Sequence, residues 1–186
     1  MIMKGRILGA VILSVILCLT GCADTHHRLI VSVPDQRMLV LTDGKPVAVY
    51  KVSTSKFGTG DLEGSYATPL GNLCVKRKIG TGTPLGTVFK SRKPTGEVLP
   101  ANAPGRDPVV TRILWLDGLE PHNRNAFKRC IYIHGTPQES FLGTPASYGC
   151  IRMSSSDIKS LYELLGPGAR VLISEEHLNV LANQEN

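Results

Sequence analysis

The chain has 186 residues, of which 42% are hydrophobic and 19% charged, and its formal net charge is +6. This length is sufficient for one domain with its own hydrophobic core. The cationic residues are spread along the chain rather than gathered in the Lys/Arg blocks that mark nucleic-acid-binding arms. The composition therefore gives no support to DNA or RNA as a partner.

The N-terminal segment has the layout of a secretory signal peptide. Lys4 and Arg6 precede an apolar run without charges over residues 7–19, and Leu-Thr-Gly-Cys ends that run at Cys22. The run is shorter than the roughly 20 apolar residues that a membrane-spanning helix needs. We therefore predict export and removal of residues 1–21, which would leave 165 residues and lower the net charge from +6 to +4 by loss of two cations.

The Leu-Thr-Gly-Cys ending resembles the bacterial lipobox, in which the cysteine is lipid-modified and becomes the first residue of the mature chain. This resemblance implies a lipid on Cys22 and a protein of the cell envelope or periplasm that is anchored to a membrane. Ala23 after the cysteine favours the outer membrane in a cell with two membranes. The alternative is an ordinary signal peptide that is cleaved nearby.

Three cysteines follow Cys22, namely Cys74, Cys130 and Cys150. An odd number of thiols in an oxidising compartment raises the question of which one stays free. A Cys74–Cys130 bridge would leave Cys150 alone. The sequence does not decide whether those two residues lie close enough to be bridged.

The mature chain is divided into a polar tether over residues 22–28, a domain over 29–174 and a C-terminal tail over 175–186. Asp43-Gly44 is a hairpin signal between two β-like segments. The segment 73–79 alternates, which places Leu73, Val75 and Ile79 on one face. Short segments rich in β-branched residues, separated by Gly and Pro, predict strands. The expected strands are residues 29–33, 37–41, 47–54, 73–79, 87–90, 109–116, 131–134 and 169–174.

One helix is expected, over residues 157–165. Ser154-Ser155-Ser156 supplies cap candidates before it, and Gly166-Pro167-Gly168 stops it. Its apolar residues recur at helical spacing, so one face should pack on the sheet: Ile158, Leu161, Leu164 and Leu165. The fold class is therefore mainly β, a sandwich or open barrel with one docked helix near residues 155–165.

His134 and Cys150 are the residues that point most directly to chemistry. Alternation in the segment 131–134 places Ile131 and Ile133 on one face, so His134 lies on the other face, with Tyr132. A thiol must lose its proton before it attacks a carbonyl, and a neighbouring imidazole can take that proton. Residue types alone leave open a buried structural thiol and a histidine that only satisfies a hydrogen bond.

The residues around Cys150 suit the same chemistry. Gly149 leaves the backbone free to approach a substrate closely, and Arg152 adds positive potential that favours a thiolate. The backbone N–H groups of Tyr148, Gly149 and Cys150 are candidates for holding an oxyanion.

The segments His134-Gly135-Thr136 and Ser147-Tyr148-Gly149-Cys150-Ile151-Arg152, with sixteen residues from the histidine to the cysteine, resemble the catalytic signature of the L,D-transpeptidase family. Thr68-Pro69-Leu70-Gly71 resembles the Thr-Pro-x-Gly segment of that family, and the likeness covers residues 28–174. The resemblance implies a β-sandwich-like domain. It also implies a cysteine that attacks the carbonyl of the third residue, usually a diamino acid, in a peptidoglycan tetrapeptide stem. The terminal D-Ala leaves, and an amine resolves the thioester.

Carried over by position, the resemblance makes Cys150 the nucleophile and His134 the general base, with the Gly135 carbonyl orienting the His134 ring. It places the remaining signature residues at the oxyanion hole and in the substrate cleft: Ser147, Tyr148, Gly149 and Arg152. The partners it implies are peptidoglycan stem peptides, and it implies no cofactor or metal.

Tyr148 departs from the family pattern, because many members have histidine at this position. A phenol titrates near pH 10 and does not exchange protons at neutral pH as an imidazole does. This leaves L,D-carboxypeptidase and D-amino-acid exchange activities open beside transfer, as well as a catalytically degenerate, lipid-anchored wall-binding protein.

Three further classes fit less well. Sortases place their histidine much farther upstream of the cysteine, and papain-like wall peptidases place cysteine before histidine. A zinc site from Cys130, His134 and Cys150 lacks a clear fourth ligand.

Overall fold

The computed structural model describes residues 23–183. The predicted leader and Cys22 lie outside this range. The strands are β1 (His27–Ser32), β2 (Arg37–Thr42), β3 (Lys45–Lys51), β4 (Gly71–Ile79), β5 (Thr87–Lys90), β6 (Lys93–Val98), β7 (Val109–Gly118), β8 (Tyr132–Gly135), β9 (Ile151–Met153) and β10 (Arg170–Ser174). The helices are η1 (Glu139–Phe141), α1 (Ser155–Leu164) and α2 (Leu178–Asn183).

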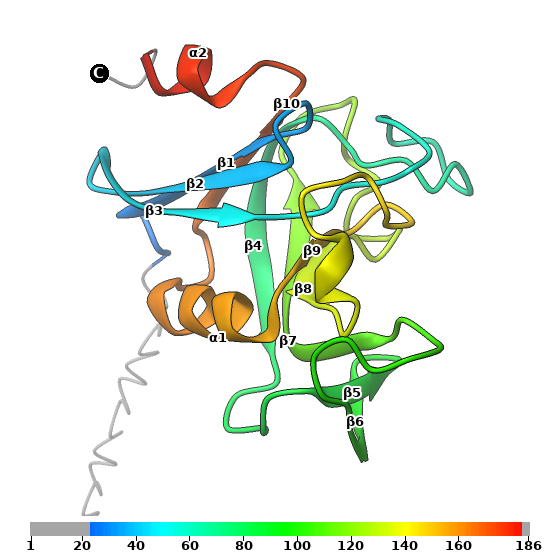
Figure 1. Ribbon diagram of the computed structural model, residues 1–186. Coiled ribbons are helices and arrows are strands. Elements are labelled where there is room, and N and C mark those ends of the chain that lie inside the picture. Colours follow the sequence, from blue (N-terminus) through cyan, green and yellow to red (C-terminus); the bar gives the residue numbers. More distant parts are fainter. Residues whose placement is uncertain (1–22, 184–186) are drawn as a thin grey trace, which may run out of the picture.

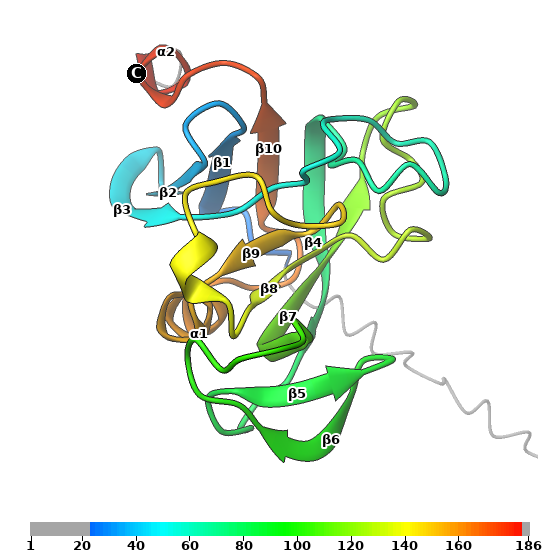
Figure 2. The same cartoon turned by 45° about the vertical axis from the view of Figure 1, so that its right-hand side comes forward.

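The strands form one mixed sheet in the order β3-β2-β1-β10-β4-β7-β5-β6. Outside this order, β8 pairs with both β7 and β9. Figures 1 and 2 show that the β5–β6 hairpin projects at one end of the molecule. Helices α1 and α2 lie apart from each other in both views. The main core collects side chains from β1, β2, β4, β7, β8, β9, β10 and α1. The sheet therefore curves around this main core, and the predicted mainly β fold with one main helix is confirmed.

The β2–β3 hairpin turns at the predicted Asp43-Gly44 pair. Both residues have positive φ, at +49° and +75°, the conformation of the tight turns that match strand twist. The first strand begins at His27, inside the segment predicted as a tether. Asp24, just before it, accepts a hydrogen bond from the Gly166 backbone N–H at 2.6 Å, so the chain already lies against the domain there.

Helix α1 forms where the serines and the apolar spacing predicted it. The Ser154 side chain caps the first turn by accepting from the Asp157 N–H at 3.0 Å. Ile158 and Leu161 are fully buried. Leu164, expected on the same face, is 41% exposed, because the packed face is narrower than the apolar spacing suggested.

A β-bulge in β4 overturns the predicted alternation of that strand. Leu73 and Val75 enter the main core as expected, but the register shifts between Val75 and Arg77. Ile79 therefore packs with Phe89 and Trp115 in a separate cluster. A single extra residue moves everything beyond it to the other face of a strand.

Strands β6 and β9 were not predicted. Every residue of β6 is exposed and it contains both Pro and Gly, so it carries no hydrophobic pattern. Strand β9 has three residues, which is too short for any periodicity to be recognised.

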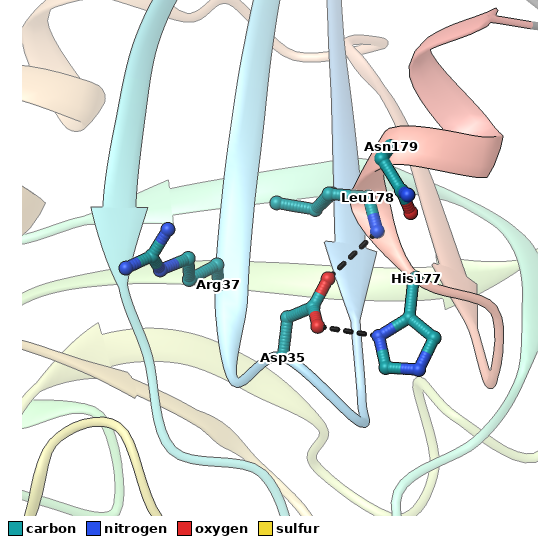
Figure 3. A pocket seen from close by; sticks show the side chains of 5 residues that line it. All are labelled: Asp35, Arg37, His177, Leu178 and Asn179. Carbon is teal, nitrogen blue, oxygen red and sulfur yellow. Dashed lines mark hydrogen bonds and ion pairs between the residues drawn. The ribbon is translucent and has the colours of Figure 1, made fainter.

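The C-terminal tail ends in α2, which is fastened to the β1–β2 turn. One Asp35 carboxylate oxygen accepts from the Leu178 N–H at 2.7 Å, and the other lies 2.6 Å from His177 Nδ1. Figure 3 shows this pair in an open cavity that Arg37 and Asn179 also line. None of these side chains is a predicted site residue. No helix within residues 23–183 combines the length and apolar character needed to cross a bilayer.

Candidate active site

Parallel pairing of β8 with β9 brings the two signature segments together. Ile133 lies opposite Ile151, and His134 lies opposite Arg152. Both isoleucines are fully buried in the main core. Because side chains alternate along each strand, Cys150, His134 and Arg152 share the other face of this pair.

The Cys150 thiol lies beside the start of β8. Its Sγ accepts a hydrogen bond from the Tyr132 N–H at 3.4 Å, and the thiol can donate to the Cys130 carbonyl at the same distance. Tyr132 is only 7% exposed. The sulfur is thus held by two backbone groups of the segment that leads into His134.

The His134 imidazole is buried, with 4% of the residue exposed. Its Nδ1 lies 2.8 Å from the Gly135 carbonyl oxygen. A carbonyl only accepts, so Nδ1 carries the proton and Nε2 is left as the basic nitrogen. The Gly135 carbonyl therefore fixes the tautomer that a general base requires.

Burial keeps both the Cys150 thiol and the His134 imidazole neutral. Desolvation lowers the pKa of His134 to about 4, although the Gly135 carbonyl favours its protonated form. Desolvation likewise raises the pKa of the Cys150 thiol to about 11, against the opposing effects of the Tyr132 N–H and of Arg152. Arg152 acts in the predicted direction, but burial outweighs it. The free site therefore holds a thiol and a neutral imidazole.

Arg152 is itself buried, with 8% of the residue exposed. Its Nη2 lies 2.6 Å from Asp107 Oδ2, and the Thr136 hydroxyl donates to Asp107 Oδ1. The guanidinium is therefore paired inside the protein. Sequence reasoning missed Asp107, because it stands in a Gly/Pro-rich loop with no pattern to single it out.

The segment before Cys150 is shaped by Ser147. The Ser147 hydroxyl donates to the Cys150 carbonyl at 2.5 Å and accepts the Gly149 N–H at 3.2 Å. The Gly149 N–H is thereby occupied. The N–H groups of Tyr148 and Cys150 have no acceptor anywhere in residues 23–183. Of the three predicted oxyanion donors, these two are available.

Gly149 is required for a steric reason. Its φ is +114°, and an added Cβ would meet the Ala67 carbonyl oxygen at 3.2 Å. Thr68, from the Thr-Pro-Leu-Gly segment, donates its hydroxyl to the Gly149 carbonyl at 3.1 Å and is fully buried. The two motifs are therefore in direct contact.

Arg129 binds the Ala67 carbonyl that faces Gly149, and it was also missed by sequence reasoning. It forms a buried ion pair with Asp61 at 2.9 Å and donates to the Ala67 carbonyl at 2.6 Å. Its charge also lowers the pKa of Cys150, by less than burial raises it.

Within residues 23–183, Cys74, Cys130 and Cys150 are free thiols. The bridge that would join Cys74 to Cys130 is therefore absent. Cys74 lies opposite Asp117 in the β4–β7 pair, whereas the Cys130 sulfur lies 3.5 Å from Arg92 Nη1. Over residues 23–183, no group of three or more His, Cys, Asp or Glu side chains is arranged to hold a metal ion.

Comparison with known proteins decides the family. The model of the L,D-transpeptidase catalytic domain (YkuD) matches residues 26–173. The chain belongs to this family. The family inferred from residues 28–174 is confirmed, and the matched range agrees with the inferred one to within two residues at each end.

Two named relatives are similar to this L,D-transpeptidase family member over most of its length. The probable L,D-transpeptidase YcfS of Escherichia coli strain K12 is 28% identical over 166 residues, which cover 84% of this chain and 47% of the relative. The putative L,D-transpeptidase YqjB of Bacillus subtilis strain 168 is 30% identical over 150 residues, covering 80% and 72%. The chain thus spans about half the length of the Escherichia coli relative.

Solved structures show the same fold. An L,D-transpeptidase from Xylanimonas cellulosilytica has a TM-score of 0.53 at 19% identity, covering 82% of this chain and 62% of its own. L,D-transpeptidase 3 from Mycobacterium tuberculosis, in complex with a faropenem-derived adduct, has a TM-score of 0.53 at 20% identity, covering 81% and 60%.

Proposed function

We propose that this protein is a peptidoglycan L,D-transpeptidase that acts through a Cys150 thioester. It would cleave a tetrapeptide stem before its terminal D-Ala and transfer the acyl group to an amine. The observation that carries the proposal is the β8–β9 register, which puts Cys150 and His134 on one face. Membership of the L,D-transpeptidase family supports the choice of substrate.

The neutral resting pair determines how the reaction starts. The raised pKa of Cys150 and the lowered pKa of His134 mean that no thiolate–imidazolium pair is formed in advance. The proton therefore moves from Sγ to His134 Nε2 as the sulfur attacks the donor carbonyl. Arg152 and Arg129 favour the developing negative charge.

The acylation half-reaction then follows from the same two residues. The new C–S bond gives a tetrahedral oxyanion, which the free N–H groups of Tyr148 and Cys150 are placed to receive. The C–N bond to D-Ala breaks, and the leaving nitrogen takes the proton from His134. The product of this half is an acyl thioester on Cys150.

The second half-reaction reverses these roles. An acceptor amine attacks the thioester and gives its proton to His134 while a C–N bond forms. The C–S bond breaks, and the proton returns from His134 to the sulfur. With water or a D-amino acid as acceptor, the same steps give trimming or exchange.

Mass spectrometry of muropeptides incubated with the mature domain tests this function. We expect cross-linked products and release of D-Ala from tetrapeptide donors, and neither with Cys150→Ser. Trimmed or exchanged products without cross-links would identify water or a D-amino acid as the acceptor. If no muropeptide changes, the proposed activity is refuted.

A penem supplies a second measurement, since one relative has been solved with a faropenem-derived adduct. The wild type should gain the mass of the adduct on the peptide that contains Cys150, and on no peptide containing Cys74 or Cys130. Equal labelling of all three thiols, or of none, would argue against an activated nucleophile.

We also propose that the protein is exported and anchored through lipid on Cys22, on the strength of the lipobox-like sequence. Two or more acyl chains hold a protein stably on a membrane, whereas one gives only marginal binding. Cys22→Ser should move the protein from the membrane fraction to the soluble or unprocessed fraction. A wild-type protein that is soluble and carries no lipid mass would contradict this.

A further inference from the structure

Three exposed aromatic rings lie together, and one of them belongs to Tyr148, two residues before Cys150. Phe57, Tyr66 and Tyr148 are each about half exposed, at 50%, 56% and 55%. Their ring centroids are 5.4–5.8 Å apart. We call these three residues the aromatic patch. Large aromatic side chains gathered on a surface leave apolar area in water, which marks a binding surface more often than a structural one.

Lys56 places a positive charge in this patch. Its ammonium donates to the Tyr148 hydroxyl at 3.1 Å and lies 4.4 Å from the centroid of that ring. It also lies 5.3 Å from the centroid of Phe57. Contact with two ring faces and one hydroxyl restricts where the ammonium can sit.

The Lys56 ammonium differs from the guanidinium groups of Arg129 and Arg152 in having no carboxylate partner in the described part of the chain. Arg129 and Arg152 each pair with a buried carboxylate. For Lys56, in contrast, no carboxylate of residues 23–183 lies within ion-pair distance. The patch therefore presents an oriented cation whose charge is not neutralised by the protein.

The patch is joined directly to the segment that carries the thiol. The Lys56 N–H donates to the Ser147 carbonyl at 3.1 Å, and Ser55 forms a β-bridge with Ser147. Tyr148 stands two residues before Cys150, so their Cα atoms are at most about 7 Å apart, from the length of an extended chain. Lys56 is therefore hydrogen-bonded to the same segment of the chain that carries Cys150.

We infer that Lys56 and the aromatic patch form a subsite for a carboxylate of the donor stem peptide. This inference rests on the proposed function. The ammonium would pair with the carboxylate, and the exposed rings would cover the aliphatic groups beside it. A tetrapeptide donor ends in a free carboxylate one residue beyond the carbonyl that Cys150 attacks, so this carboxylate is the first candidate. A carboxylate elsewhere in the stem is the other source of the same chemistry.

Binding to a Cys150→Ala background tests the subsite without turnover. The probes are a stem tetrapeptide, the same peptide amidated at its C-terminus, and the peptide amidated only at its internal carboxylate. Lys56→Met removes the charge and keeps the chain length, Lys56→Arg keeps the charge, and Lys45→Met is a control on an exposed lysine of β3. Dissociation constants are measured by calorimetry, with thermal melts to verify folding.

We expect Lys56→Met to weaken binding of the free tetrapeptide about tenfold, the lower part of the range for a charge-assisted hydrogen bond, since the site is open to water. Lys56→Arg should restore most of this loss, and Lys45→Met should change nothing. If Lys56→Met no longer weakens binding of the C-terminal amide, the terminal carboxylate is the group that Lys56 binds. If it no longer weakens binding of the internal amide, the internal carboxylate is that group.

An equal effect of Lys56→Met on the free peptide and on both amides would overturn the inference, as would no effect on any of them. Turnover by the wild type is measured separately. A protein that binds the tetrapeptide through Lys56 but never releases D-Ala would refute the proposed function and leave the subsite standing.

Discussion

His134 and Tyr148 belong to the same signature, yet they stand in opposite environments. His134 is 4% exposed and is held by a backbone carbonyl, whereas Tyr148 is 55% exposed and contacts an unneutralised lysine. Charges are weakly screened inside a protein and strongly screened at its surface. The inner face, formed by Cys150 and His134, should therefore control reactivity. The outer rim, formed by Tyr148 and Lys56, should control which ligand binds. Substitutions on the two sides should separate these effects.

The largest effect is expected at Cys150. Cys150→Ser should lower kcat/KM for release of D-Ala by roughly a thousandfold or more, because a serine hydroxyl is a far weaker nucleophile next to a neutral imidazole. Cys130→Ser is the matched control, since that thiol lies nearby but is not a member of the proposed pair. Equal losses in both variants would mean that the inner face is merely structural.

His134→Ala should slow acylation of Cys150 by roughly a hundredfold or more, the scale of a lost general base. The measurement is the rate of adduct formation with a penem, followed by mass spectrometry. His26→Ala provides a control at an exposed histidine. If His134→Ala is acylated at the wild-type rate, a group other than His134 is the general base.

The pH dependence of alkylation examines the same pair without substrate. With a pKa of about 11, Cys150 should react with iodoacetamide about a hundredfold faster at pH 10 than at pH 8. A thiol with the ordinary pKa of about 8.5 gains only about fourfold over that interval. Peptide-resolved labelling of native and urea-unfolded protein gives both profiles. A native Cys150 rate that levels off below pH 8 would show a preformed thiolate.

Arg152→Met should destabilise the fold by about 3 kcal/mol, because it leaves the Asp107 carboxylate buried without its partner. Replacing both residues, as Arg152→Met with Asp107→Asn, should recover part of that loss. Urea unfolding of the two variants gives the comparison. We also expect Arg152→Ala to lower kcat/KM more than Tyr148→Phe does. A fully stable Arg152→Met would mean that this ion pair is dispensable.

Tyr148→Phe should have the smallest effect, with kcat/KM within about threefold of wild type, since one lost neutral hydrogen bond typically costs only ~1 kcal/mol. The aromatic ring and the backbone N–H both remain. A hundredfold loss in Tyr148→Phe, with a harmless Arg152→Ala, would place the phenol in the chemistry and reverse the contrast between rim and inner face.

Local pattern predicted much of this fold from the sequence. The strand at Thr87–Lys90 has the expected bounds, and α1 starts two residues earlier than expected, at Ser155. Ile79 was assigned to the wrong face because a bulge depends on the register of the partner strand, which one strand's pattern does not contain.

The candidate site was predictable only where a motif recorded it. The motif singled out the signature residues, whose roles stay a prediction, and Thr68 was flagged through its Thr-Pro-Leu-Gly segment. Asp107 and Arg129 were missed because each acts through partners far away in the sequence. The burial that sets the pKa values of Cys150 and His134 is likewise a property of the whole packed sheet.

The pairing of β1 with β10 has a consequence for the order in which the molecule can assemble. His27–Ser32 lies near the beginning of the described chain, yet it pairs in parallel with Arg170–Ser174 near its end. Such pairing gives a high contact order, and its loop-closure entropy must be overcome before the contact contributes any stability. A chain that emerges N-terminus first, from a ribosome or through a membrane pore, leaves one edge of β1 uncovered until residue 174 has followed. The central strands β1 and β4 would then be joined last, by β10 inserting between them.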